Sequence, residues 1–122
     1  MIRALLLLAV VLSGWPVLAR GQTFSPQSSS GLSVSFTTER AGGSRILVFG
    51  DIRNATNSTA DHVVVLAEGL DEGGRVVSRG RVYVAGTVPS HGSSSFEIRL
   101  LASGSEKRYR VQVEAFEFLQ GN

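Results

Sequence analysis

The chain has 122 residues, with 12 Lys or Arg and 10 Asp or Glu, so its formal net charge is +2. This length allows one domain at most besides any targeting segment. The small charge and the scattered arginines argue against a nucleic-acid partner. The sequence has no cysteine, which excludes a disulfide framework, thiol chemistry and a lipid-modified cysteine.

The N-terminal segment 1–22 has the pattern of a secretory signal peptide. Arg3 supplies a positive start, and the continuous apolar run Ala4–Leu12 follows it. That run is about half of the ~20 residues needed to span a bilayer, so we expect cleavage rather than a membrane anchor. Cleavage after Ala19 is the first choice, and cleavage after Gly21 stays open. The pattern predicts a periplasmic or secreted protein with no transmembrane segment after cleavage.

Three parts of the chain are expected. Residues 1–19 are the signal peptide, and residues 20–30 form a flexible lead-in rich in Ser, Gln, Pro and Gly, which cannot bury enough apolar surface to offset its ordering entropy. Residues 31–120 form the folded domain.

Short apolar strands dominate the folded domain. Residues 32–38 alternate between apolar and hydroxyl side chains, as in a strand with one buried face. Residues 45–54 and 62–70 read as two further strands, and the polar loop between them favours a hairpin. The sequence Asp71-Glu72-Gly73-Gly74 is typical of a tight turn. It lacks the alternating oxygen ligands of a calcium loop.

The second half of the domain continues this pattern. Residues 75–78 and 81–87 are expected to form one interrupted strand or two short strands, with a bulge at Arg79-Gly80 between them. Turns are expected at 89–92 and 102–106, with a strand at 94–100 between them. The last strand, 108–119, changes its apolar parity at Phe116. This change indicates either a bulge near Ala115-Phe116 or a strand end that is covered on both faces.

About seven strands are predicted, and no segment outside the signal has a helical apolar period. The fold class is therefore all-β, an immunoglobulin-like antiparallel β-sandwich of about seven strands preceded by a cleavable signal peptide.

A family resemblance covers residues 45–100. Its pattern is Val-x-Gly-x-Val-x-Asn, a polar loop, alternating valines, an Asp-x-x-Gly turn, and a Pro-Gly-containing turn before a Phe-containing strand. The matching positions are Val48, Gly50, Ile52, Asn54, Val63, Val65, Asp71, Gly74, Pro89 and Phe96. In these residues the chain resembles the FxLYD-type bacterial domain family. The resemblance implies an immunoglobulin-like β-sandwich in an exported or envelope-associated protein and supplies no enzymatic motif.

The glycine, asparagine, histidine and aspartate residues that stand out are interpreted first as structural rather than functional residues. Gly50 would allow a close approach to its strand, and Asn54 would cap a strand end by bonding loop backbone. His62 and His91 are the two histidines, and neither belongs to a recognisable catalytic motif. Asp51, Asp61 and Asp71 recur every ten residues, which is typical of hairpin periodicity; a metal site would require them to converge.

The predicted function is therefore binding rather than catalysis. We expect a non-catalytic exported or envelope module for protein–protein interaction or structural support, whose partner is another envelope protein or a second copy joined through an edge strand. The alternative is a periplasmic domain that binds a small ligand or a glycan. An enzyme would need a convergent acid–base pair, and none is found. No catalytic, cofactor-binding or metal-binding residue is assigned, and no cofactor is expected.

Overall fold

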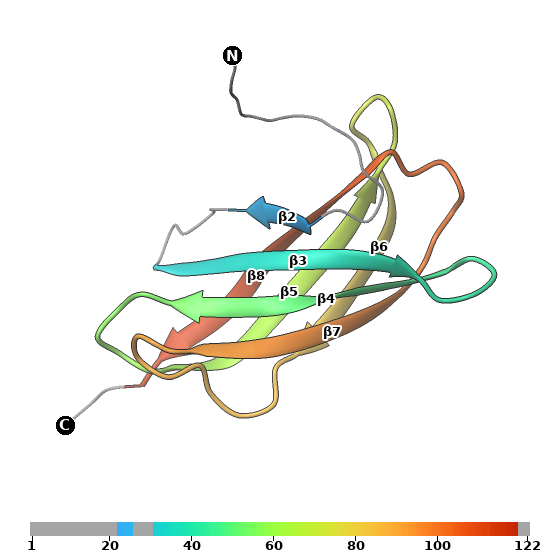
Figure 1. Ribbon diagram of the computed structural model, residues 1–122. Coiled ribbons are helices and arrows are strands. Elements are labelled where there is room, and N and C mark those ends of the chain that lie inside the picture. The colour runs from blue at the N-terminus through green and yellow to red at the C-terminus, as the bar shows by residue number, and fades with distance from the viewer. Residues whose placement is uncertain (1–21, 26–30, 120–122) are drawn as a thin grey trace, which may run out of the picture.

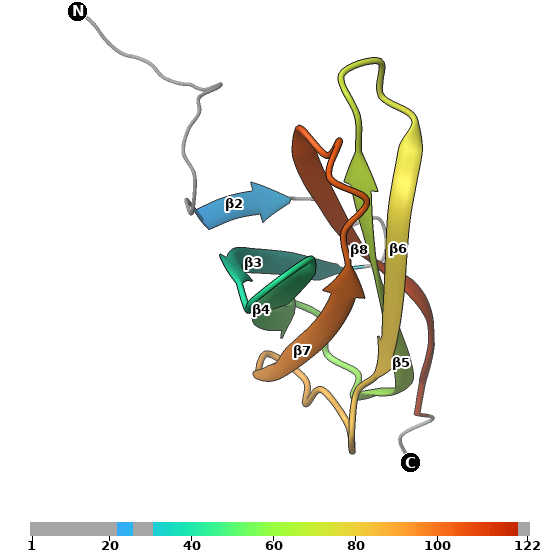
Figure 2. The same ribbon diagram turned by 90° about the vertical axis from the view of Figure 1, so that its right-hand side faces the viewer.

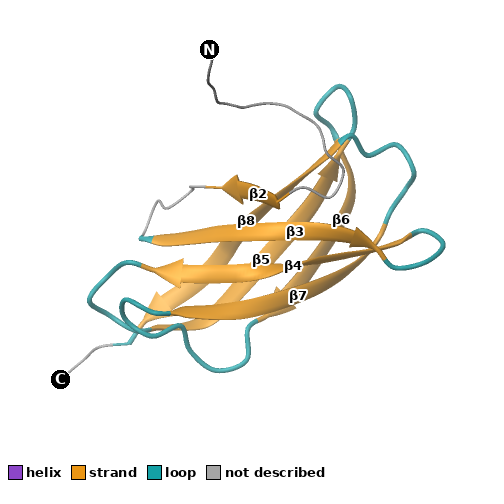
Figure 3. Cartoon of the chain, in the orientation of Figure 1, coloured by secondary structure: helices purple, strands orange, loops and turns teal. Residues whose placement is uncertain are grey.

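The computed structural model describes residues 22–25 and 31–119 (Figure 1). The predicted signal peptide lies outside the described residues. Those residues form strands joined by loops and turns, and they include no helix (Figure 3). The strands are β2 (Gln22–Ser25), β3 (Leu32–Arg40), β4 (Arg45–Asn54), β5 (Ala60–Leu70), β6 (Val76–Tyr83), β7 (Ser93–Leu101) and β8 (Arg108–Phe118).

The strands form two antiparallel sheets that pack face to face (Figure 2). One sheet has the order β3-β4-β7, with the short β2 added at the β3 edge, and the other has the order β6-β5-β8. The arrangement is sandwich-like, so the expected all-β class with two packed antiparallel sheets is confirmed. Strand β2 lies within the segment 20–30, where Phe24 pairs with Ser35 of β3.

The core lies between the sheets and follows the period-two pattern of the sequence. Side chains in a strand alternate between its faces, so every second residue of a strand faces the core. The buried positions are Leu32, Val34 and Phe36 in β3, Ile46, Val48 and Ile52 in β4, Val63, Val65 and Ala67 in β5, Phe96, Ile98 and Leu100 in β7, and Val111 in β8. Ala60 and Val88 complete this cluster.

The expected hairpin between the strands at 45–54 and 62–70 is wrong. β4 pairs with β3 and β7, whereas β5 pairs with β6 and β8, so the loop 55–59 crosses from one sheet to the other. Each of the two strands points one apolar face into the same core, and the two faces meet there from opposite sides. Two strands show the same apolar alternation whether they are paired in one sheet or face each other across the core. The sequence pattern therefore could not distinguish a hairpin from a crossing between sheets.

The expected interruption at Arg79-Gly80 is also wrong. β6 runs unbroken from Val76 to Tyr83, and Gly80 stays in register with Ala67. Gly80 instead allows β7 to approach, because a Cβ atom there would lie 2.9 Å from Ile98 Cγ2. The irregularity in this pair falls at Gly69/Leu70 of β5.

The predicted irregularity in the last strand is confirmed close to its expected position. Along β8, Val113 pairs with Val65 and Ala115 pairs with Val64, so Glu114 is an extra residue. A second register shift lies between Asp61 and Val64 of β5, where His62 has a positive φ of 52°. The first of these shifts changes which β8 side chains face the core.

Candidate functional site

Strand β8 is the longest edge strand among residues 22–25 and 31–119, and it has a strand partner on one side alone. Edge β6 lies against β7, as the close approach at Gly80 shows (Figure 2). At the far edge of the other sheet lies the short β2, which pairs with β3. Among residues 22–25 and 31–119, the eleven-residue strand β8 pairs with β5 alone. An unpaired edge of this length presents a row of backbone donors and acceptors to another strand.

The direction of these backbone groups follows from two hydrogen bonds of β5. The carbonyl of Val63 accepts from the N–H of Val84 on the β6 side, and the carbonyl of Leu70 accepts from Lys107 on the β8 side. Backbone groups alternate between the two neighbours of a strand, so Leu66 and Glu68 are directed to β8. Their register partners there are Gln112 and Arg110.

The intervening residues of β8 therefore point their backbone groups outward. By the same alternation, the N–H and C=O of Tyr109, Val111 and Val113 are directed away from β5. At the other end of β8, the N–H of Leu119 donates to the carbonyl of Thr59, so Leu119 is directed toward β5. Because the direction alternates with each residue, the backbone groups of Phe116 are directed outward. The outward groups are thus available on both sides of the bulge.

The inner-face side chains at this edge are apolar. Tyr109, Val113 and Phe116 pack partly against the core. Phe118 is 36% exposed and Leu119 is 44% exposed. The rings of Phe116 and Phe118 meet edge to face, with centroids 4.9 Å apart. Apolar surface therefore accompanies the unpaired backbone at the C-terminal half of β8.

The outer-face side chains of the same sheet form an ion-pair network. Glu68 is only 6% exposed and lies between two arginines, 2.6 Å from Arg110 Nη2 and 3.4 Å from Arg79 Nη2. Arg81 binds both oxygens of Glu114, at 2.6 and 3.0 Å. The hydrogen bond from Arg81 is the main cause that lowers the pKa of Glu114. This network explains why the outward-facing Leu66 is buried: its register partner Arg81 reaches across it toward β8.

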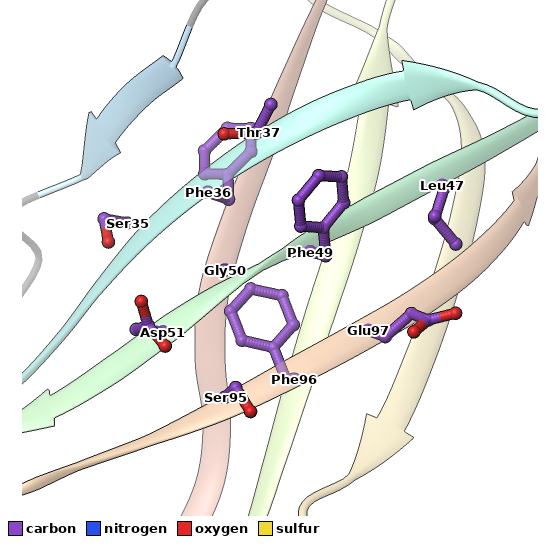
Figure 4. A pocket seen from close by; sticks show the side chains of 10 residues that line it. All are labelled: Ser35, Phe36, Thr37, Leu47, Phe49, Gly50, Asp51, Ser95, Phe96 and Glu97. Atoms are coloured by element: carbon purple, nitrogen blue, oxygen red, sulfur yellow. The ribbon is translucent and has the colours of Figure 1, made fainter.

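A second candidate surface is a hollow of about 600 Å³ on the outer face of β3, β4 and β7 (Figure 4). Its apolar part comes from Leu47 and Phe49, and Asp51 and Glu97 add carboxylates. The hydroxyl groups that line it come from Ser35, Thr37 and Ser95. It is open to solvent, and Phe36 and Phe96 line it together with Phe49 and these polar groups.

Gly50 lies in the wall of this hollow for a structural reason. A Cβ atom at Gly50 would overlap the carbonyl oxygen of Ser35 and lie 2.7 Å from Phe36 Cα. Phe36 and Phe96 are its register partners on the two neighbouring strands. The predicted close approach at this glycine is confirmed, and it comes from the backbone of β3.

Asn54 holds the loop that joins the two sheets. The side chain is fully buried, and its Nδ2 donates to the carbonyls of Ser58 and Val88 at 2.8 and 3.1 Å. Its Oδ1 accepts from the N–H and the hydroxyl of Thr56 at 2.9 and 2.7 Å. The predicted capping role is confirmed, and the bond to Val88 extends it beyond the local loop.

The histidines lie apart from each other and from any catalytic arrangement. His62 is 72% exposed, with Nδ1 3.1 Å from Glu117 and 3.4 Å from Asp61. The neighbour Glu117 could not be found from the sequence, because 55 residues separate it from His62. His91 Nε2 lies 2.7 Å from Asn57 Oδ1 and links two loops.

The three aspartates do not converge. Asp51 lies on the outer face of β4, and Asp61 and Asp71 lie at opposite ends of β5. Asp71 accepts from the N–H groups of Gly73 and Arg75, as expected of the turn. Over the described ranges 22–25 and 31–119, no group of three or more His, Cys, Asp or Glu residues is placed to hold a metal ion.

Comparisons with protein-family models, with curated proteins and with solved structures give no match for this chain. In the part of the chain that the structure describes, no helix has the length and apolar character needed to cross a membrane.

Proposed function

We propose that this protein is an exported, non-catalytic binding module that recognises another protein through the open edge of β8. The observation that carries the proposal is the outward direction of the backbone groups of Val111 and Val113 on a strand that pairs with β5 alone within residues 22–25 and 31–119. Recognition by strand addition uses these main-chain groups for affinity and nearby side chains for specificity.

The strand order supports an immunoglobulin-like assignment. In that fold one sheet contains strands A, B and E, and the other contains C and F, with C′ beside C in variable-type domains. β3, β4 and β7 correspond to A, B and E, while β6, β5 and β8 correspond to C′, C and F. Strand G, which pairs with F in that fold, has no counterpart among residues 22–25 and 31–119. An added strand at β8 would occupy this position.

The proposed location rests on the sequence. The segment 1–22 has the features of a signal peptide, and residues 45–100 resemble the FxLYD-type domains of exported bacterial proteins. The partner is accordingly a protein chain of the cell envelope or of the secreted fraction that offers an extended strand to β8.

The test is a pull-down from the envelope fraction of the source cell. The bait is the chain from Arg20 with a C-terminal tag, and retained proteins are identified by mass spectrometry. Val113→Pro removes an N–H that is directed to the open edge and not to β5, so it blocks strand addition while sparing the β5 ladder. Val113→Ala is the matched control, because it also removes the branched valine side chain but keeps the N–H.

One protein retained in stoichiometric amount by the parent and by V113A, and lost with V113P, is the expected result. Circular dichroism spectra show whether V113P keeps its fold. A partner that binds folded V113P as well as it binds V113A contradicts recognition through β8.

The hollow on the outer face of β3, β4 and β7 supports a second candidate function, the binding of a glycan or small ligand. Phe49 supplies an apolar surface with hydroxyl and carboxylate groups around it (Figure 4). The test is a melting-temperature screen of the folded protein against glycans and metabolites. A shift that is lost with Phe49→Ala but kept with Tyr83→Ala, an exposed aromatic residue of β6 outside the hollow, favours this function over the first.

A further inference from the structure

We infer that the partner of β8 is a second copy of this chain, joined by antiparallel pairing of the two β8 strands about a two-fold axis at Gln112. The result is one continuous sheet of six strands, β6-β5-β8 followed by the same three strands of the second copy in reverse order. The inference rests on the proposed function, since it names the occupant of the open edge.

The backbone directions define this register. An antiparallel pair needs residues with outward N–H and C=O groups opposite each other. With Gln112 opposite its symmetry mate, Val111 of one copy lies opposite Val113 of the other, and both carry outward groups. Both are also inner-face residues, since they pair with Ala67 and Val65 of the core.

The bulge preserves this match along the rest of the strand. Glu114 is an extra residue, so the alternation of inner-face and outer-face side chains is shifted by one residue beyond it. Tyr109 of one copy then lies opposite Phe116 of the other, and both side chains belong to the inner face. The pairing covers the partly exposed rings at the C-terminal half of β8, which β5 leaves accessible.

Charge complementarity favours a second copy in this orientation. The outer-face charges of β8 are basic in its first half, at Arg108 and Arg110, and acidic in its second half, at Glu114 and Glu117. Antiparallel pairing about Gln112 places Arg110 opposite Glu114 and Arg108 opposite Glu117, each twice because of the two-fold axis. Parallel pairing would place like charges together. The strand is therefore complementary to itself.

Cysteine cross-linking tests the register directly, because the chain contains no cysteine of its own. Gln112 would lie in a non-hydrogen-bonded pair with its symmetry mate, where Cα atoms are about 4.5 Å apart. A disulfide spans that separation. Gln112→Cys is expected to give a covalent dimer on mild oxidation of the chain from Arg20. Ser95→Cys, on the outer face of the other sheet, is the control and is expected to stay monomeric.

A charge exchange tests the pairing without cysteine. Arg108→Glu and Glu117→Arg each place like charges opposite each other twice, and each is expected to weaken the dimer roughly tenfold in sedimentation velocity. A mixture of the two variants restores opposite charges at both positions. We expect the mixed dimer to form at the concentration at which the parent does.

The outcomes separate this inference from the proposed function. Cross-linking of Q112C alone, with rescue in the charge-exchanged mixture, supports the β8 dimer. Cross-linking of S95C instead, or a chain that stays monomeric at every concentration, overturns it. A monomer that captures another protein, and loses it with V113P, overturns the dimer while supporting the proposed function. A monomer that captures nothing through β8 overturns both.

Discussion

Glu68 Oε1 accepts a hydrogen bond from Arg110 Nη2 at 2.6 Å, and this pair joins β5 to β8 on the outer face of their sheet. The carboxylate is almost fully buried, and Arg79 approaches its other oxygen at 3.4 Å from β6. One acidic side chain of the central strand thus binds both neighbouring strands. The contact adds a side-chain link to the backbone pairing that holds β8 against β5.

Replacing Glu68 should destabilise the sheet. Glu68→Gln keeps the shape of the side chain but leaves two arginines without their counter-charge. We expect a loss of about 1 to 3 kcal/mol in the free energy of unfolding, since both arginines can still reach solvent. Urea unfolding followed by circular dichroism measures it. Glu97→Gln, in the exposed pair with Arg99, is the control and should change stability by less than about 0.5 kcal/mol. Equal losses for the two substitutions would show that the burial of Glu68 does not increase its contribution to stability.

Asn54→Ala should be among the most destabilising single changes in the loops. The substitution removes four hydrogen bonds from a fully buried side chain and leaves the carbonyl of Val88 without this donor. The expected loss is about 2 to 4 kcal/mol, read from the shift in urea midpoint. Asn57→Ala, three residues away and exposed, should cost less than about 1 kcal/mol. A loss of stability in N54A no larger than that in N57A would mean that other contacts hold the loop 55–59.

The sequence predicted where strands lie far better than how they pair. Alternation identified the buried faces of β3, β4 and β7, because a half-buried strand must repeat every two residues. The partner of a strand leaves no such trace. The β4–β5 connection therefore read as a hairpin, although Asn54 anchors a crossing between sheets through its bond to Val88.

The candidate site was hidden for the same reason. The apolar and charged residues of β8 are visible in the sequence, but an open edge is defined by the absence of a neighbour within the described residues, and only the strand order gives that. The parity change at Phe116 was the one local signal near this edge. The roles of Gly50 and Asn54 could be predicted because they follow from residue type: glycine in a strand permits a close backbone approach, and asparagine at a strand end bonds nearby backbone groups.

Gly50→Ala should disrupt the sheet at its centre. The new methyl group would overlap the carbonyl oxygen of Ser35, which is backbone and cannot rotate away as a side chain can. We expect a loss of about 3 kcal/mol or a failure to fold, measured by thermal melting and by soluble yield. Gly73→Ala is the control, since the nearest atom to its Cβ would be Asp71 Oδ1 at 3.6 Å. A G50A protein as stable as G73A would contradict the close approach of β3.

Glu106 should make stability depend on pH in acid. Burial raises the pKa of its carboxyl, but the nearby Ser78 hydroxyl and the N–H groups of Ser103 and Gly104 outweigh it and lower the pKa to about 2 from the ordinary 4.5. Because the pKa is depressed in the folded state, the stabilisation is fully present above pH 4.5 and is lost as the pH falls toward 2.

Glu106→Gln isolates this contribution. The variant should be less stable than the parent at pH 6 to 7 by about 1 kcal/mol, a value reduced for the solvent exposure of the group. The difference should shrink between pH 4.5 and 2, because the carboxyl of the unfolded parent takes up a proton below its ordinary pKa of 4.5, whereas that of the folded parent does so only near 2. Urea midpoints of both proteins across this range measure it. A difference that stays constant down to pH 2 would assign the effect to shape and not to the charge of Glu106.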